Sequence, residues 1–117
     1  MAVLSKVLLS GSTQGKGIKV VETATAGTTI HTAVSGTTDL DEIWLWAVNS
    51  DTSPRKLTLE WGEAAAPDGN IEVTIPAEDG LVLVAPGLLL QNGLVVKAFA
   101  AAANVVIIHG YVNRMDI

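Results

Sequence analysis

The sequence contains no cysteine, only seven lysines and arginines, and few aromatic residues. Without cysteine, the chain can form neither a disulfide framework nor a thiolate zinc site, and it has no thiol nucleophile. The seven basic residues are outnumbered by twelve acidic ones, which gives a formal net charge of −5. Nucleic-acid binders need a broad basic surface to neutralise phosphates, so DNA and RNA are not expected as partners.

Long uninterrupted apolar segments are also missing. The apolar run within residues 1–9 is shorter than the core of a signal peptide, which needs about 7 to 15 apolar residues. The uncharged segment 80–96 is interrupted by Pro86, Gly87 and Gly93, whereas a membrane helix needs about 20 mostly apolar residues. We therefore expect a soluble protein that is made in the cytoplasm, carries no export signal and has no membrane partner.

Short apolar runs rich in Val, Ile, Leu and Thr recur along the chain, each bounded by Gly, Pro, Asn, Asp or Ser. This pattern is typical of the strands of a sandwich or barrel. It predicts one all-β domain over residues 1–117, a single antiparallel β-sandwich that is jelly-roll-like and has eight or nine short strands. The expected strands cover residues 3–9, 18–22, 28–34, 42–49, 56–62, 71–75, 81–85, 94–100 and 105–112. An alanine-rich helix over residues 97–104 is the alternative for one of them.

Residues 42–62 predict a β-hairpin with one wholly apolar face. The residues of that face are expected to pair across the two strands and to lie in the core: Trp44 with Trp61, Trp46 with Leu59, and Val48 with Leu57. Aromatic side chains also carry much of the binding energy of ligand surfaces. A platform on which sugar rings stack is therefore the alternative interpretation of the three tryptophans.

The C-terminal third of the chain is poor in charge. Residues 80–117 hold only Lys97, Arg114 and Asp116 among 38 positions. Successive apolar residues there indicate strands buried on both faces, whereas a thin sandwich buries only one face of each sheet. The other face is expected to pack against another copy of the chain. The candidate interface residues are Leu83, Leu89, Leu94, Val106 and Ile108.

Two groups of polar residues could carry chemistry. His31 and His109 lie in different expected strands, and no ligand spacing accompanies them, so a histidine satisfied by a hydrogen bond is the favoured interpretation. Asp39, Asp41 and Glu42 offer oxygen ligands for calcium, but the rest of an EF-hand loop is missing. We therefore predict no catalytic residue, no cofactor, no metal site and no enzymatic activity.

Five stretches carry a resemblance to a known class of proteins: DEIWLWAVN at residues 41–49, KLTLEWG at 56–62, IPA at 75–77, PGLLLQNGL at 86–94 and NVVIIHGYVNR at 104–114. With the short, cysteine-free, all-β chain, they resemble small virion structural proteins of tailed bacteriophages, especially head-decoration or cement proteins. The resemblance implies a trimer that sits on the capsid lattice, binds the major capsid protein or another virion protein, and stabilises the head. A carbohydrate-binding or fibre-tip domain and a tail, neck or baseplate component are the alternatives.

Overall fold

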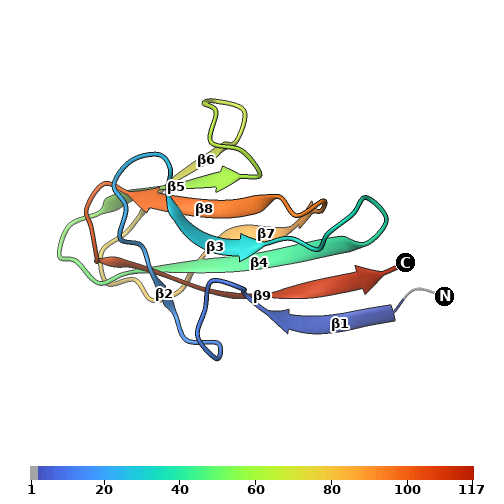
Figure 1. The fold of residues 1–117 in the computed structure, drawn as a ribbon. Helices are drawn as coiled ribbons and strands as arrows, with labels where there is room; N and C mark the ends of the chain where they lie inside the picture. Colours follow the sequence, from blue (N-terminus) through green and yellow to red (C-terminus); the bar gives the residue numbers. More distant parts are fainter. Residues whose placement is uncertain (1–2) are drawn as a thin grey trace.

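The computed structural model describes residues 3–117, which form nine strands in two antiparallel sheets packed face to face (Figure 1). The strands are β1 (Val3–Leu8), β2 (Ile18–Lys19), β3 (Thr28–Thr32), β4 (Leu40–Asn49), β5 (Arg55–Trp61), β6 (Asn70–Ile75), β7 (Val82–Leu90), β8 (Val95–Ala100) and β9 (Val106–Asp116). The all-β sandwich expected from the sequence is confirmed. The alternative helix over residues 97–104 does not form, and none of the described residues belongs to a helix that could cross a membrane.

The strand order is that of a jelly roll. Sheet A has the order β1-β9-β4-β7, with β2 also beside β9, and sheet B has the order β3-β8-β5-β6. Apart from β1–β2 and β5–β6, successive strands belong to opposite sheets, which is how a jelly roll is wound. Because β1 pairs with β9, Val3 lies opposite Asp116, so the beginning of β1 and the end of β9 lie side by side (Figure 1).

The core lies between the sheets and is formed by alternate residues of the long strands. In β4, Ile43, Leu45 and Ala47 point inward and are fully buried. Leu57 and Leu59 of β5 belong to the same apolar cluster from the side of sheet B. Side chains of a strand alternate between its two faces, so the residues between these positions in β4 must face away from the core.

The predicted hairpin between residues 42–49 and 56–62 is wrong. β4 pairs with β7 and β9 in sheet A, whereas β5 pairs with β6 and β8 in sheet B. The connection crosses between the sheets, and the Asn49 amide secures it by donating to the Ser53 carbonyl at 2.9 Å and to the Ile75 carbonyl at 3.0 Å. The inner faces of β4 and β5 belong to the same apolar cluster, but they face each other across the sandwich and are not neighbours in one sheet.

The inward face of β4 is also the opposite of the predicted one. Trp44 and Trp46 lie on the outer face of sheet A and are half-buried, and Trp61 is half-buried at the margin of the core. The inner face instead includes the polar residues Asp41 and Asn49, which are almost completely buried. A buried polar group is tolerated when its hydrogen bonds are satisfied, and both of these side chains are satisfied.

The chain itself covers part of the outer face of sheet B. The segment 20–27, between β2 and β3, reaches Glu60 of β5, whose carboxylate accepts from the Thr25 hydroxyl and from the Gly27 N–H, the latter at 2.6 Å. Thr58 and Glu60 point away from the core, yet they are 3% and 1% exposed. Both faces of β5 are therefore buried within a single chain.

Candidate interaction surface

Three aromatic side chains form a row on the outer face of sheet A. Trp44 and Trp46 project from β4, and Tyr111 projects from the neighbouring β9. The ring centroids of Trp44 and Trp46 are 6.1 Å apart with an interplanar angle of 20°, and those of Trp46 and Tyr111 are 6.0 Å apart at 27°. These spacings lie in the range of favourable aromatic pairs. We refer to these three side chains as the aromatic row.

The two ends of the aromatic row contact other parts of the protein. The Nζ atom of Lys6 lies 4.5 Å from the centroid of the Tyr111 ring, a cation–π contact. At the other end, the Trp44 Nε1–H donates to Glu42 Oε1 at 2.7 Å. The backbone of Gly87 lies so close to this indole that a Cβ there would be 2.9 Å from the ring. Much of the ring surface is therefore already in contact with protein atoms.

A line of polar side chains crosses three strands beside the aromatic row. Lys6 lies opposite Asn113, and Asn113 lies opposite Glu42. The Asn113 amide donates to Glu42 Oε1 at 3.0 Å, the same oxygen that accepts from Trp44. These two hydrogen bonds, that of Asn113 first, hold the pKa of the Glu42 carboxyl below its ordinary value because they favour the ionised form. The surface thus presents a carboxylate and an ammonium group next to aromatic rings.

Exposed leucines flank the aromatic row on both margins of sheet A. Leu4 and Leu8 of β1 are 66% and 55% exposed, and Leu83 and Leu89 of β7 are 46% and 52% exposed. In the strand register, Leu8 lies opposite Tyr111 and Leu83 opposite Trp46. Contiguous exposed apolar patches of this kind mark interaction sites. We call the aromatic row with these four leucines the apolar face.

Of the five interface residues expected from the sequence, three are exposed in the structure and two are buried. Leu83 and Leu89 lie in the apolar face, and Leu94 is exposed just before β8 in sheet B. Val106 and Ile108 are fully buried because they point from β9 into the core. These two residues are therefore unavailable to another copy, contrary to expectation. In the apolar run of β9, the residues that point inward are buried in the core, whereas Ile107, which points outward, is only half-buried.

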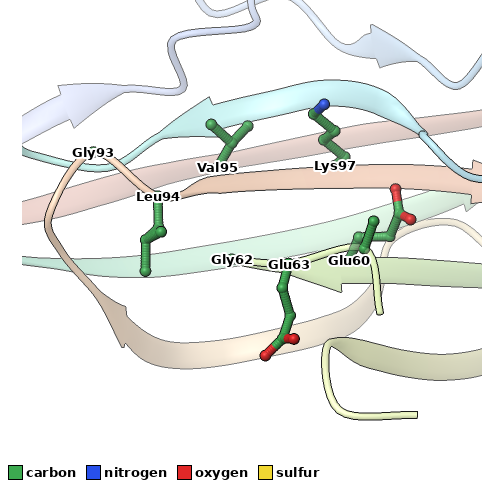
Figure 2. Close-up of a pocket in the computed structure, with 8 residues that line it drawn as sticks. Glu60, Gly62, Glu63, Gly93, Leu94, Val95 and Lys97 are labelled. Carbon is green, nitrogen blue, oxygen red and sulfur yellow. The ribbon is translucent and has the colours of Figure 1, made fainter. Parts of the chain in front are cut away.

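A cavity of about 240 Å³ opens on the outer face of sheet B. It lies between the end of β5 and the beginning of β8, and Figure 2 shows Glu60, Glu63, Leu94 and Lys97 at its wall. Both oxygens of Glu60 are engaged by the segment 20–27. The buried carboxylate at this cavity therefore has a structural role in holding that segment.

His31 belongs to a buried network that joins the two sheets. Its Nε2 lies 2.8 Å from Asp41 Oδ2, and Arg114 reaches the same carboxylate through Nε at 2.8 Å and Nη2 at 2.9 Å. Burial raises the pKa of the Asp41 carboxyl, but the hydrogen bonds of Arg114 and His31 and the charge of Arg114 outweigh it and keep the pKa below its ordinary value. The hydrogen bonds that Arg114 donates to Asp41 in turn raise the pKa of Arg114, because they favour its charged form. The network ties β3 to β4 and β9.

The arrangement around His31 differs from that of a catalytic triad. In a triad the aspartate accepts from Nδ1 and the nucleophile lies at Nε2. Here Nδ1 accepts from the backbone N–H of Ser10 at 3.0 Å, so Nε2 carries the proton that is donated to Asp41. The Ser10 hydroxyl instead accepts from the Thr32 N–H at 2.7 Å. His109 is exposed on β9 in the other sheet, so the two histidines do not form a pair.

The three acidic residues considered for calcium point in different directions. Asp39 accepts from the backbone N–H of Ile117 at 3.0 Å, Asp41 points into the core, and Glu42 points to the outer face of sheet A. Neighbouring residues of a strand project to opposite faces, which separates the last two. Within residues 3–117, no group of three histidine, aspartate or glutamate side chains is placed to hold a metal ion.

The chain was compared with known protein families, curated proteins and solved structures, and none of them matches it.

Sequence reasoning missed the apolar face because it assigned Trp44 and Trp46 to the core. A usable signal lay in β9. Counted in steps of two over residues 106–113, one set is Val106, Ile108, Gly110 and Val112, all aliphatic or small. The other set is Ile107, His109, Tyr111 and Asn113, which is polar or aromatic after its first member. The second set marks the outward face, on which Tyr111 is found.

Proposed function

We propose that this protein is a non-enzymatic structural protein of a virion, which binds other protein subunits through its apolar face and so acts as a head-decoration or cement protein. The observation that carries the proposal is the outer face of sheet A, where the aromatic row lies between exposed leucines. Trp and Tyr are enriched at protein–protein interfaces and supply much of their energy. Jelly rolls occur in viral capsid and lectin domains, but the fold alone does not define a function.

Association with further copies of the chain is part of this proposal. A standard interface buries about 800 Å² on each partner, and apolar burial contributes about 25 cal/mol per Å². Such a gain offsets part of the entropy lost on association. Copies bound to an assembled head would stabilise it, because a ligand that binds only the assembled form shifts the equilibrium toward that form.

Carbohydrate binding is the second candidate, because the aromatic row lies beside the polar side chains of Glu42 and Asn113. Stacking of a sugar requires a free ring face. Lys6 lies over the Tyr111 ring, the Gly87 backbone lies against Trp44, and Trp46 lies near-parallel to both other rings. These contacts favour a protein partner over a glycan.

Binding to phage heads tests the proposal. The protein is mixed with empty heads of the phage whose genome encodes it, the heads are sedimented, and the bound protein and the heat resistance of the heads are measured. We expect binding and a higher temperature of head disruption. Heads that neither bind the protein nor gain heat resistance would refute the decoration role.

Two charge variants assign the binding to a surface. Leu83→Lys places an ammonium group opposite Trp46 in the apolar face, whereas Glu63→Lys places one at the cavity of sheet B. Both positions are exposed, so both variants should keep the melting temperature within a few degrees. We expect Leu83→Lys to lose head binding and Glu63→Lys to retain it. A titration of tryptophan fluorescence with oligosaccharides should produce no change, and saturable quenching would support the carbohydrate-binding alternative.

A further inference from the structure

The outer edge of β1 is open. β1 (Val3–Leu8) pairs with β9 on one side, and no other strand among residues 3–117 pairs with it. It also projects from the sandwich, so that Val3 on one face and Leu4 on the other are 53% and 66% exposed. An exposed apolar edge strand presents unpaired N–H and C=O groups and is a template for pairing with another chain.

The opposite edge of sheet A, formed by β7, is protected. Pro86 lacks an N–H group, and Gly87 has a φ of 77°. The register against β4 shifts twice, between Ile43 and Trp44 and between Leu45 and Trp46. Proline and bulges on an edge strand prevent further pairing. β1 contains neither a proline nor a bulge, and the ammonium group of Lys6, its single charged residue, lies over the Tyr111 ring on the outer face of the sheet.

The edges of sheet B are protected in other ways. β3 has a register shift, and its outer edge is occupied by the segment before β2: the Gly11 N–H donates to the Ile30 carbonyl at 2.9 Å, and the Thr32 N–H donates to Ser10 Oγ at 2.7 Å. β6 carries Glu72, which is ion-paired with Lys56. A negative charge on an edge disfavours pairing between copies of a chain whose net charge is already −5.

We propose that the outer edge of β1 pairs antiparallel with β1 of a second copy around a twofold axis, which joins two copies of sheet A into one continuous sheet. The argument for a second copy is that two identical edge strands can pair antiparallel around a twofold axis, which repeats each contact in both directions. Such a pair covers exposed apolar residues on both faces of β1, and an offset of two residues keeps its single charged residue, Lys6, away from the Lys6 of the other copy. The pairing also brings the apolar faces of the two copies next to each other.

Faces and charges together select the register of this pair. Residues that lie opposite one another in an antiparallel pair project to the same face, so even-numbered residues must pair with even-numbered ones. With Ser5 opposite Ser5 of the second copy, Leu4 lies opposite Lys6 and Val3 opposite Val7. A shift by one step brings the two Lys6 side chains directly opposite each other, which is unfavourable. Centring the pair on Leu4 or on Val7 would also keep the two Lys6 side chains apart, but it would pair only three residues of each β1 strand, whereas centring it on Ser5 pairs five. We therefore place the centre of the pair at Ser5.

A single-cysteine variant tests both the contact and its register. The chain contains no cysteine, so Ser5→Cys introduces one thiol at an exposed position. Directly opposite residues in an antiparallel pair have Cα atoms about 4.5 or 5.5 Å apart, which is within the reach of a disulfide. On mild oxidation at micromolar concentration, we expect Ser5→Cys to form a covalent dimer that is reversed by dithiothreitol.

Leu4→Cys is the matched control, since it also introduces one exposed thiol on β1. In the proposed register, Leu4 is displaced from its own counterpart by two residues, roughly 7 Å along the strand. That separation is beyond the usual reach of a disulfide, so Leu4→Cys should remain monomeric on non-reducing gels. Failure of Ser5→Cys to cross-link, or equal cross-linking of both variants, would overturn the proposal.

Mass in solution and a charge variant test the pairing without cysteine. The natural chain should sediment at twice the 12.1 kDa mass of one chain. Ser5→Asp places two carboxylates opposite each other and should weaken the dimer by about fivefold, whereas Thr37→Asp adds the same charge in a remote exposed turn and should not. A trimer, or equal effects of the two variants, would contradict edge pairing. Either result would leave the role of the apolar face to be decided by head binding with Leu83→Lys.

Discussion

The outer faces of the two sheets differ in how far the rest of the chain covers them. On sheet B, the segment 20–27 lies over β5 and hydrogen-bonds to Glu60, which leaves that carboxylate 1% exposed. On sheet A, the corresponding carboxylate Glu42 is bonded only to its neighbours Trp44 and Asn113, and the aromatic row beside it is half-buried. One face is closed by the protein's own backbone, and the other presents large apolar side chains.

This difference shows that burial within the monomer does not follow the size or hydrophobicity of a side chain. β4 buries Leu45 completely while the larger Trp46 beside it faces outward. The core of a sandwich has a limited thickness, and side chains from both sheets must interdigitate within it. Medium-sized aliphatic residues fit that space, and the tryptophans occupy a surface that we assign to a partner.

The largest expected effect is that of truncating the inner face. Leu45→Ala removes a fully buried side chain between two sheets that cannot fully collapse, so it should lower the free energy of unfolding by about 4 kcal/mol. Chemical denaturation followed by tryptophan fluorescence measures this value. A loss below that of Trp46→Ala would reverse the assignment of the two faces of β4.

The next effect concerns Asp41, the inward neighbour of Glu42. Asp41→Asn breaks the paired hydrogen bonds with Arg114 and should cost about 3 kcal/mol at neutral pH. The folded-state pKa of Asp41 is lowered, so its stabilising contribution is complete above the unfolded pKa of about 3.9 and is lost as the pH falls through the folded-state pKa. The natural protein should therefore lose stability below about pH 4, and Asp41→Asn should lose less in that range.

Glu42→Gln is the outward control for this pH dependence. The pKa of Glu42 is lowered as well, but this carboxylate lies on the surface. Its hydrogen bonds are exposed to competing water, so the variant should change the acid limb of the stability curve much less than Asp41→Asn does. Equal changes from the two variants would show that the acid sensitivity does not arise from the buried network.

A smaller effect is expected where the chain closes the face of sheet B. Glu60→Ala leaves the Gly27 N–H and the Thr25 hydroxyl without their acceptor and should cost about 2 kcal/mol. Hydrogen exchange should rise in the segment 20–27 before it rises in β5. Glu63→Ala, at an exposed carboxylate beside the same cavity, should stay within about 0.5 kcal/mol of the natural protein.

The smallest effect on the monomer is expected from Trp46→Ala. The side chain is half-buried, so its removal should lower the free energy of unfolding by only about 1 kcal/mol. The same variant should strongly weaken association with a partner, because aromatic residues near the centre of an interface carry much of its energy. A large loss of monomer stability with unchanged association would show that the aromatic row serves the fold alone.

The strands were predictable from the sequence, and their partners were not. Turn residues such as those in residues 50–54 mark where a strand ends, and all nine expected strands exist. Whether β4 and β5 pair in one sheet or face each other across the core is a different matter, because both arrangements bring Leu57 and Leu59 against apolar residues of β4. The pattern of apolar and polar residues along β4 and β5 is the same in both arrangements, so the pattern cannot show which arrangement forms.

The candidate surface was predictable only in part. Leu83 and Leu89 were predicted as interface residues because the segment after residue 80 is poor in charge, and both are exposed in the structure. The orientation of β4 depends instead on Asp41, whose burial requires His31 from β3 and Arg114 from β9. Partners so distant in the sequence are known only once the fold is known. The tryptophans were assigned to the core because they share a wholly apolar face with Val48, and that face of β4 points outward.

The position of β9 in the middle of sheet A sets the order in which the protein can fold. Sheet B is complete once the chain has been synthesised to Ala100, whereas β1 and β4 both need residues up to Asp116 as partners. Pairing between the two ends of a chain gives a high contact order, and all-β domains of this kind fold in milliseconds to seconds. During that interval the aromatic row and the edge of β1 are exposed together. We therefore expect refolding yield to fall with protein concentration, and a circular permutant that places β9 directly before β1 should fold faster than the natural chain.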